Sequence, residues 1–172
     1  MATDFDWAGL RALAKRLDDL VAGTRDDEEY AQDVRRALTF VYTAGVTMPS
    51  AGEVFDAAGG DEFWNDTIDL DSELAEESAA RTAVDALAQR LAASVRAAQQ
   101  DPDLDADELA DLADTAAQGL YDTWVGLSTG ARYFDEKRAD EAAWEWSFGF
   151  DEWGSNAVAA IAALHELLWG AR

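Results

Sequence analysis

Hydrophobic residues recur every three or four positions along most of the chain, which is the spacing that gathers them on one face of an α-helix. The pattern is clear near the N-terminus, where Asp4 or Asp6 is suited to cap a helix and Gly23 to end it. The apolar positions of this stretch are Leu10, Leu13, Leu17, Leu20 and Val21. We therefore expect an amphipathic first helix between these two signals.

A second helix is predicted over 26–46, because the apolar spacing continues and acidic residues fill its first turn, where the helix dipole favours them. Pro49 ends it. Residues 47–72 are the least regular part of the chain, but 51–57 can form a short helix before Gly59 breaks it.

Further helices are predicted over 72–99 and from Asp105, where Glu108 gives the spacing of a capping box. Glycines at 126–130 predict a break in the latter helix. Another helix should start near Asp135, and a last one should carry the apolar stripe to the C-terminus. We find no repeat, linker or domain boundary. The sequence predicts one all-α domain over 1–172, a bundle of about six helices.

One aromatic segment departs from helical spacing. Trp144, Trp146, Phe148 and Phe150 alternate with polar or small residues, which is the period of a β-strand. However, no other segment alternates convincingly, and a lone strand would leave its backbone hydrogen bonds without partners. On a helix, Trp144 and Phe148 share one side, while Trp146, Phe150 and Trp153 lie nearly opposite. We therefore favour a helix that is buried on both sides.

The formal net charge of −23, from 36 acidic against 13 basic residues, disfavours direct binding to nucleic acids and to anionic membranes. The longest apolar run, 157–164, is too short to cross a bilayer. Acids occur on nearly every segment, which favours a halophilic protein, since molar salt shortens the Debye length to about 3 Å. An ordinary acidic protein and an acidic mimic of nucleic acid are the alternatives.

Other features bear on location and cofactors. The acidic N-terminus lacks the basic region of a signal peptide, and cysteine is absent, so a cytoplasmic protein fits best. Gly59–Phe63 spells the GGDEF string of diguanylate cyclases, and 101–105 begins like a calcium loop, but both lack the required context. We predict no cofactor and no metal site, with a carboxylate-only metal site as a minor alternative.

The C-terminal third resembles a known family. Residues 112–168, above all the string AWEWSFGF at 143–150 followed by Trp153-Gly154, are similar to the C-terminal half of the DUF5063 family. This is a helical bacterial family with no assigned biochemical function. The resemblance implies a helical fold and a shared site near this segment. Where the family pattern has histidines, this chain has Glu152 and Asn156, which puts any histidine-based metal or acid–base chemistry in doubt.

The leading hypothesis is a non-enzymatic binding or interaction module with a Trp-rich C-terminal site. Trp is enriched at interface hot spots, and Trp faces beside acids suit a cation, so the partner would be a protein or a small cationic ligand. The candidate residues are Trp144, Glu145, Trp146, Glu152, Trp153, Asn156 and His165.

An enzyme is the main alternative. It would use Glu145, Glu152 and His165, the only histidine, as acid–base or metal groups. This hypothesis requires at least two of the three to converge within about 7 Å in one pocket. His165 also suits a structural role near a helix C-terminus, where a protonated imidazole favours the dipole.

Overall fold

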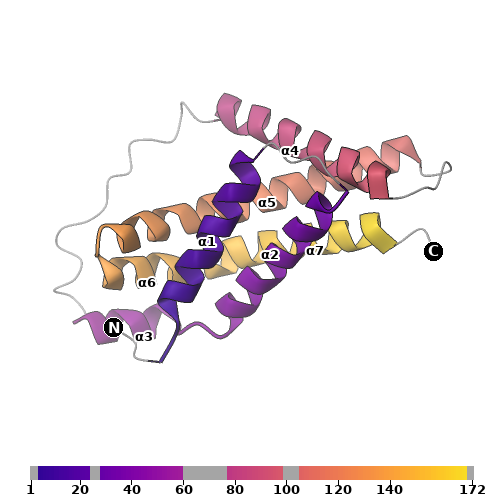
Figure 1. The fold of residues 1–172 in the computed structure, drawn as a ribbon. Helices are drawn as coiled ribbons and strands as arrows, with labels where there is room; N and C mark the ends of the chain where they lie inside the picture. The colour runs from indigo at the N-terminus through magenta and orange to yellow at the C-terminus, as the bar shows by residue number, and fades with distance from the viewer. Residues whose placement is uncertain (1–3, 24–27, 60–76, 99–104, 170–172) are drawn as a thin grey trace.

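Seven helices and no strand form the part of the chain that the computed structural model describes, residues 4–23, 28–59, 77–98 and 105–169 (Figure 1). The predicted all-α fold is confirmed, with one helix more than the expected number. The helices are α1 (Trp7–Ala22), α2 (Tyr30–Val46), α3 (Ala51–Ala58), α4 (Glu77–Ala98), α5 (Ala106–Asp135), α6 (Ala139–Phe148) and α7 (Phe150–Trp169).

Polar side chains set the starts of several helices. The Asp6 carboxylate accepts a hydrogen bond of 2.8 Å from the backbone N–H of Gly9, so α1 begins where the sequence predicts. Ser50 and Glu53 form a complete capping box at α3. Asp105 caps α5 by accepting from the first backbone N–H groups of that helix. These caps satisfy donors that a helix cannot satisfy internally.

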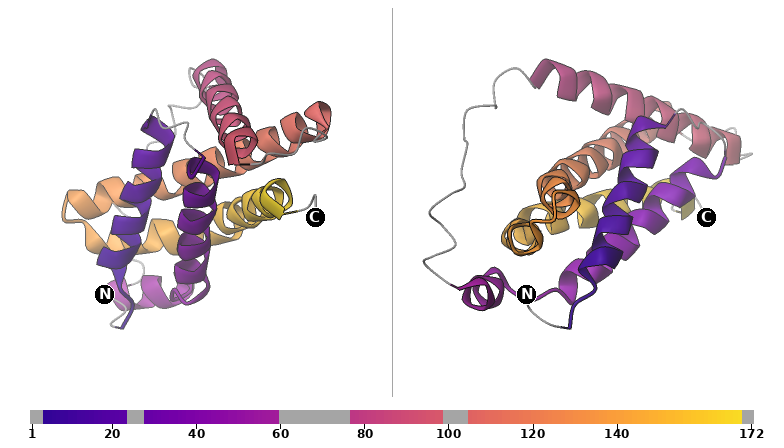
Figure 2. Two further views of the ribbon diagram at one scale, coloured as in Figure 1. Left: turned by 45° about the vertical axis from the view of Figure 1, so that its right-hand side comes forward. Right: turned by 60° about the vertical axis from the view of Figure 1, so that its left-hand side comes forward.

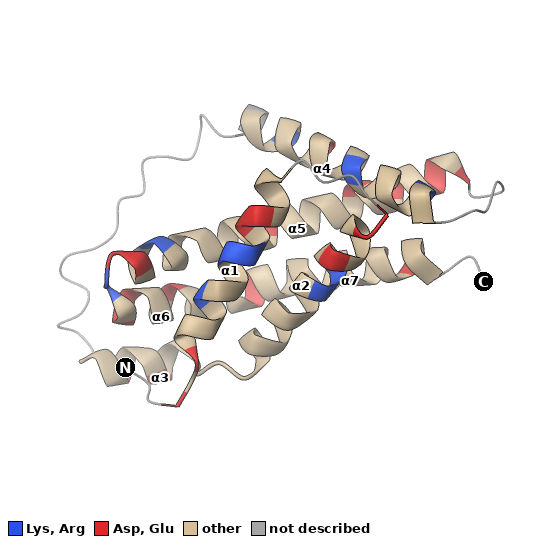
Figure 3. Ribbon diagram, in the orientation of Figure 1, with Lys and Arg blue, Asp and Glu red and all other residues tan. Residues whose placement is uncertain are grey.

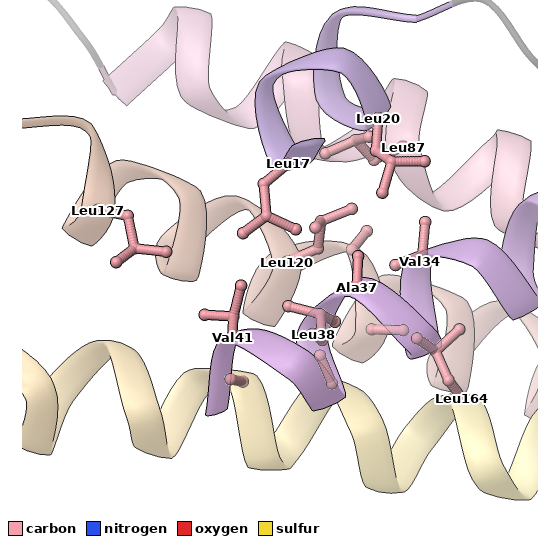
Figure 4. Close-up of a cluster of buried hydrophobic side chains, with 14 of the residues drawn as sticks. Leu17, Leu20, Val34, Ala37, Leu38, Val41, Leu87, Leu120, Leu127 and Leu164 are labelled. Atoms are coloured by element: carbon pink, nitrogen blue, oxygen red, sulfur yellow. The ribbon is translucent and has the colours of Figure 1, made fainter. Parts of the chain in front are cut away.

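The long helices α5 and α7 lie side by side and form the most extensive helix pair of the fold (Figures 1 and 2). Helix α2 crosses α7, while α1 and α4 pack on α5 and α3 packs on α6. Leucines and valines from these helices meet in one core, which includes the fully buried Leu17, Leu38, Leu120 and Leu164 (Figure 4). This packing places α6, with its aromatic residues, beside the C-terminal part of α5 and beside α3.

The predicted break at 126–130 is wrong, because α5 runs without interruption to Asp135. The glycines there serve close packing instead. A Cβ atom at Gly126 would lie 2.7 Å from the Cβ of Trp153, and one at Gly130 would lie 2.5 Å from the Nε1 of Trp146. Only glycine therefore lets two tryptophans approach this side of α5 so closely.

The aromatic segment is helical, so the strand alternative is excluded. Helix α6 ends at Phe148, Gly149 follows as its C-cap, and α7 starts at Phe150. A tight turn that includes Lys137, with φ of 64°, separates α5 from α6. The chain therefore doubles back after α5, so that α6 and α7 pack along it (Figure 1).

Some predictions concern residues that the structure does not describe. Most of the GGDEF string and of the calcium-like turn lies outside the described residues, as do the first positions predicted for the helices at 26 and 72. Within the described ranges, no helix has both the length and the apolar character needed to span a membrane.

Candidate functional site

Two of the predicted site tryptophans belong to the core. Trp146 is 0% and Trp153 is 1% exposed. The indole N–H of Trp146 donates to the backbone oxygen of Leu127, and that of Trp153 donates to the backbone oxygen of Trp146, each at 3.0 Å. Their polar atoms are thus satisfied inside the protein. Neither ring is exposed at the surface, which counts against that part of the binding hypothesis.

The surroundings of the Trp146 ring show its structural role. It stacks on Trp7 of α1 with centroids 6.1 Å apart and lies 5.9 Å from the ring of Phe134 on α5. The Trp153 ring makes an edge contact with Phe150 at 4.8 Å. The aromatic cluster therefore joins the N-terminal helix to the C-terminal hairpin of helices.

Trp144 faces the other side of α6. It is half-buried and stacks on Phe148 with centroids 4.7 Å apart and planes 14° from parallel, while Phe148 is 66% exposed. Of the three predicted site tryptophans, Trp144 alone borders the solvent, and the neighbouring exposed phenylalanine was not among the predicted site residues.

Glu145 follows Trp144 on α6 and is half-buried. Burial raises the pKa of its carboxyl group, and the positive charge of Arg132 partly opposes that change. The environment of Glu145 is thus less favourable to a negative charge than bulk water is.

The three groups of the enzyme hypothesis do not form one site. Glu152 and His165 are both exposed on α7, thirteen positions apart, which corresponds to about 20 Å along a helix. His165 lies beside Trp169, with ring centroids 5.2 Å apart. Glu152 borders a recess that Glu145 does not line. Glu152 and His165 therefore do not converge, and His165 occupies the last turns of α7.

A recess between α5 and the start of α7 brings three of the predicted site residues together. Its volume is about 430 Å³, and Glu152, Trp153 and Asn156 line it from α7. Helix α5 contributes Asp122, Val125 and Gly126, and Gly149 lies at the α6–α7 junction. We refer to this hollow as the α5–α7 recess.

Close helix packing shapes the α5–α7 recess. Gly126 permits the backbone of α5 to approach Trp153, as the fold shows. The buried hydroxyl of Thr123 lies 2.6 Å from the backbone oxygen of Gly119 and 3.3 Å from that of Trp153, which ties the two helices together. The recess therefore has a fixed backbone frame.

The polar lining of the recess is acidic. Asp122 accepts a hydrogen bond of 2.8 Å from the amide nitrogen of Gln118 on the same helix, while Glu152 extends from α7. No lysine or arginine is among the described residues that line it. Sequence reasoning did not select Asp122. The sequence feature that could have identified Asp122 is its position four residues before Gly126. That spacing places both residues on one face of α5.

Acidic residues also cover the rest of the molecule. Each of the seven described helices carries at least one Asp or Glu, and the acids visible in Figure 3 are spread over several elements. Among the described residues, no group of three or more Asp, Glu or His side chains is placed to hold a metal ion.

The family model described as "Domain of unknown function (DUF5063)" matches residues 13–169, and the chain therefore belongs to this family. The match extends from α1 to the end of α7, well beyond the part that the sequence motifs mark. No curated protein and no solved structure is detectably similar to the chain.

Proposed function

We propose that this DUF5063 protein is a non-enzymatic binding module that holds a small organic cation in the α5–α7 recess. The observation that carries the proposal is the convergence of Asp122 from α5 with Glu152 and Asn156 from α7 on one hollow whose described lining has no basic side chain. The ligand class is an ammonium or guanidinium group on a short carbon skeleton.

The recess has the features of a small-molecule site. Its volume of about 430 Å³ falls within the usual range for such sites. Two carboxylates in a concave wall concentrate negative potential, and the Asn156 amide oxygen can accept a hydrogen bond from a cation. Val125, which is 47% exposed, supplies an apolar wall for the carbon atoms of the ligand. This mixture favours an organic cation over a bare metal ion.

Isothermal titration calorimetry with n-butylammonium and n-butylguanidinium tests the proposal, with n-butanol as the uncharged control ligand. We expect saturable binding of at least one cation in physiological salt. Asp122→Asn and Glu152→Gln should each weaken it about tenfold, which corresponds to about 1.4 kcal/mol.

Glu166→Gln is the matched control, because Glu166 is an exposed acid on the same helix as Glu152 and its replacement changes the net charge equally. It should leave the affinity unchanged. Equal weakening by Glu166→Gln and Glu152→Gln would show that the cation responds to overall charge only. Absence of saturable binding to the wild-type protein would also refute the proposal.

We also propose that the acidity is an adaptation to a salty cytoplasm. Support comes from the placement of acids on every described helix, since an acidic mimic of nucleic acid needs a concentrated face. The mimic hypothesis predicts that the protein competes with DNA for a basic protein, and the salt hypothesis predicts a stability gain in KCl.

A further inference from the structure

The two most exposed large hydrophobic side chains of the described chain border the same groove. Phe148 is 66% exposed at the end of α6, and Val46 is 58% exposed at the end of α2. Both line a groove of about 660 Å³ between the α2–α3 turn and the α6–α7 junction, together with Met48 and Phe150. We refer to it as the Phe148 groove.

Ordered elements build the walls of the Phe148 groove. The stacking of Phe148 on Trp144, at 4.7 Å between centroids, restricts the phenylalanine ring. On the other element, the Ser50–Glu53 capping box fixes the start of α3 directly after the turn, with 2.8 Å between the Ser50 backbone nitrogen and the Glu53 carboxylate. Walls that are already ordered lose little conformational entropy when a partner binds.

The groove also contains an unused polar group. Ser147 lines it, and its buried hydroxyl oxygen has no hydrogen-bond partner in the described part of the protein. A buried hydroxyl without a partner costs free energy. The lining of the groove thus combines apolar side chains with serine hydroxyls and two carboxylates.

The acidic residues that line the groove favour a partner with positive charge. The charged residues that line it are Glu53 and Asp151, and its described lining includes no lysine, arginine or histidine. A second copy of this chain would bring a further net charge of −23 to the contact, which opposes association at ordinary salt. A basic partner has the complementary charge.

We propose that the Phe148 groove binds a basic, amphipathic segment of a partner protein. An aliphatic or aromatic anchor of the segment rests against Phe148 and Val46, and its Lys or Arg side chains face Asp151. Partly exposed aromatic anchors in a groove are typical of protein recognition sites. This surface shares no lining residue with the α5–α7 recess, so each proposal can fail without the other.

Fluorescence anisotropy with labelled model peptides tests the proposal. The probe is a short amphipathic peptide of Leu and Lys, compared with one in which Glu replaces Lys and one in which Ser replaces Leu. We expect the Leu/Lys peptide to bind at least tenfold more tightly than either comparison peptide. Equal affinity for the Ser/Lys peptide would show that charge alone attracts the probe and would overturn the proposal.

Phe148→Ser should weaken binding of the Leu/Lys peptide about tenfold or more, and Asp151→Asn should weaken it severalfold. Phe40→Ser is the matched control, because Phe40 is 51% exposed on α2 but does not line the groove. It should leave the affinity unchanged. Equal effects of Phe148→Ser and Phe40→Ser would overturn the proposal.

Two further measurements make the result decisive. If circular dichroism shows that Phe148→Ser has lost its fold, Val46→Ser takes its place, since Val46 lines the same groove from another helix. Sedimentation velocity tests the competing occupant. A wild-type dimer that Phe148→Ser converts to a monomer would replace the peptide-binding proposal with self-association. Asp122→Asn should leave peptide binding unchanged.

Discussion

Trp146 and Trp144 stand two positions apart on the same helix, yet their surroundings differ completely. Trp146 is fully buried between α1 and α5, with its indole N–H bonded to the backbone of α5. Trp144 is half-buried and stacks on the exposed Phe148. Two positions on a helix differ by about 200° in direction. Alternation in an aromatic run can thus describe a helix with two apolar sides as well as a strand.

The comparison also separates structural from functional aromatic residues. A buried tryptophan whose N–H is satisfied by a backbone oxygen contributes mainly to stability. An exposed phenylalanine ring is unfavourable in water. When a stacked partner holds it in place, it indicates a binding surface better than a buried ring does. The family motif contains both kinds, so a match to the motif alone does not distinguish core from surface.

Truncation of the two tryptophans gives the largest predicted contrast. Trp146→Ala should lower the free energy of unfolding by about 3–5 kcal/mol, because it leaves a cavity and removes the hydrogen bond to Leu127. Trp144→Ala should cost about 1 kcal/mol, since it removes one partly exposed stack. Urea unfolding followed by circular dichroism measures both. Similar losses in the two variants would contradict the assignment of Trp146 to the core.

A methyl group added beside the buried ring should produce the next largest effect. In Gly130→Ala, the new Cβ would lie 2.5 Å from the Nε1 of Trp146, so the helices must separate at a cost of about 1–3 kcal/mol. Gly52→Ala is the control, because no atom lies within 4 Å of its Cβ position. It should gain about 0.5–1 kcal/mol from helix propensity. A stable Gly130→Ala protein would show that this contact is loose.

Salt should change the repulsion between surface carboxylates and have little effect on the packing of the buried core. Molar KCl screens the repulsion between surface carboxylates, so thermal unfolding should shift upward by about 2–4 °C, equivalent to about 1 kcal/mol. Scanning calorimetry in dilute buffer and in molar KCl measures this shift. Because potassium chloride strengthens apolar burial little, a lack of gain would refute salt adaptation.

The smallest predicted effect concerns Glu145, beside the two tryptophans. Its pKa is raised in the folded state by burial, so its charged form opposes folding at neutral pH. This cost disappears as the pH falls from the raised pKa through the ordinary glutamate pKa of 4.5. Glu145→Gln should therefore stabilise the protein at pH 7 by about 0.5 kcal/mol or less, because the group remains partly hydrated.

Glu53 provides the opposite sign for comparison. Hydrogen bonds from Ser50 lower the pKa of Glu53 in the folded protein. The charged carboxylate therefore stabilises the fold at any pH above the pKa that Glu53 has in the unfolded chain. This contribution is lost as the pH falls through the lowered pKa. Glu53→Gln should destabilise the protein at pH 7. Urea titrations at pH 7 and at low pH measure both variants, and effects of the same sign at pH 7 would contradict this interpretation of the two environments.

Much of the fold was predictable from local signals. The apolar spacing of α1, the Asp6 cap and the Pro49 stop act within a few residues, so their consequences are present in the sequence. The glycines at 126–130 were misread, because a glycine that admits a neighbouring ring and a glycine that ends a helix look the same in sequence. Their meaning depends on Trp146 and Trp153, which lie elsewhere in the chain.

The candidate site was predictable only in part. Glu152, Trp153 and Asn156 were identified from the family motif, and they share the α5–α7 recess. Asp122 was missed because it lies thirty positions before Glu152 and shares a recess with it only through helix packing. His165 was included because it is the only histidine, but a continuous helix holds it away from Glu152.

The sequence by itself determined that this protein is helical, strongly acidic and a relative of DUF5063, because helical periodicity, charge and motif are properties of residues near one another in the chain. The tertiary structure decided which aromatic rings are buried and which carboxylates meet. Those properties depend on the side of each helix that another helix covers, and residues far apart in the sequence set that choice.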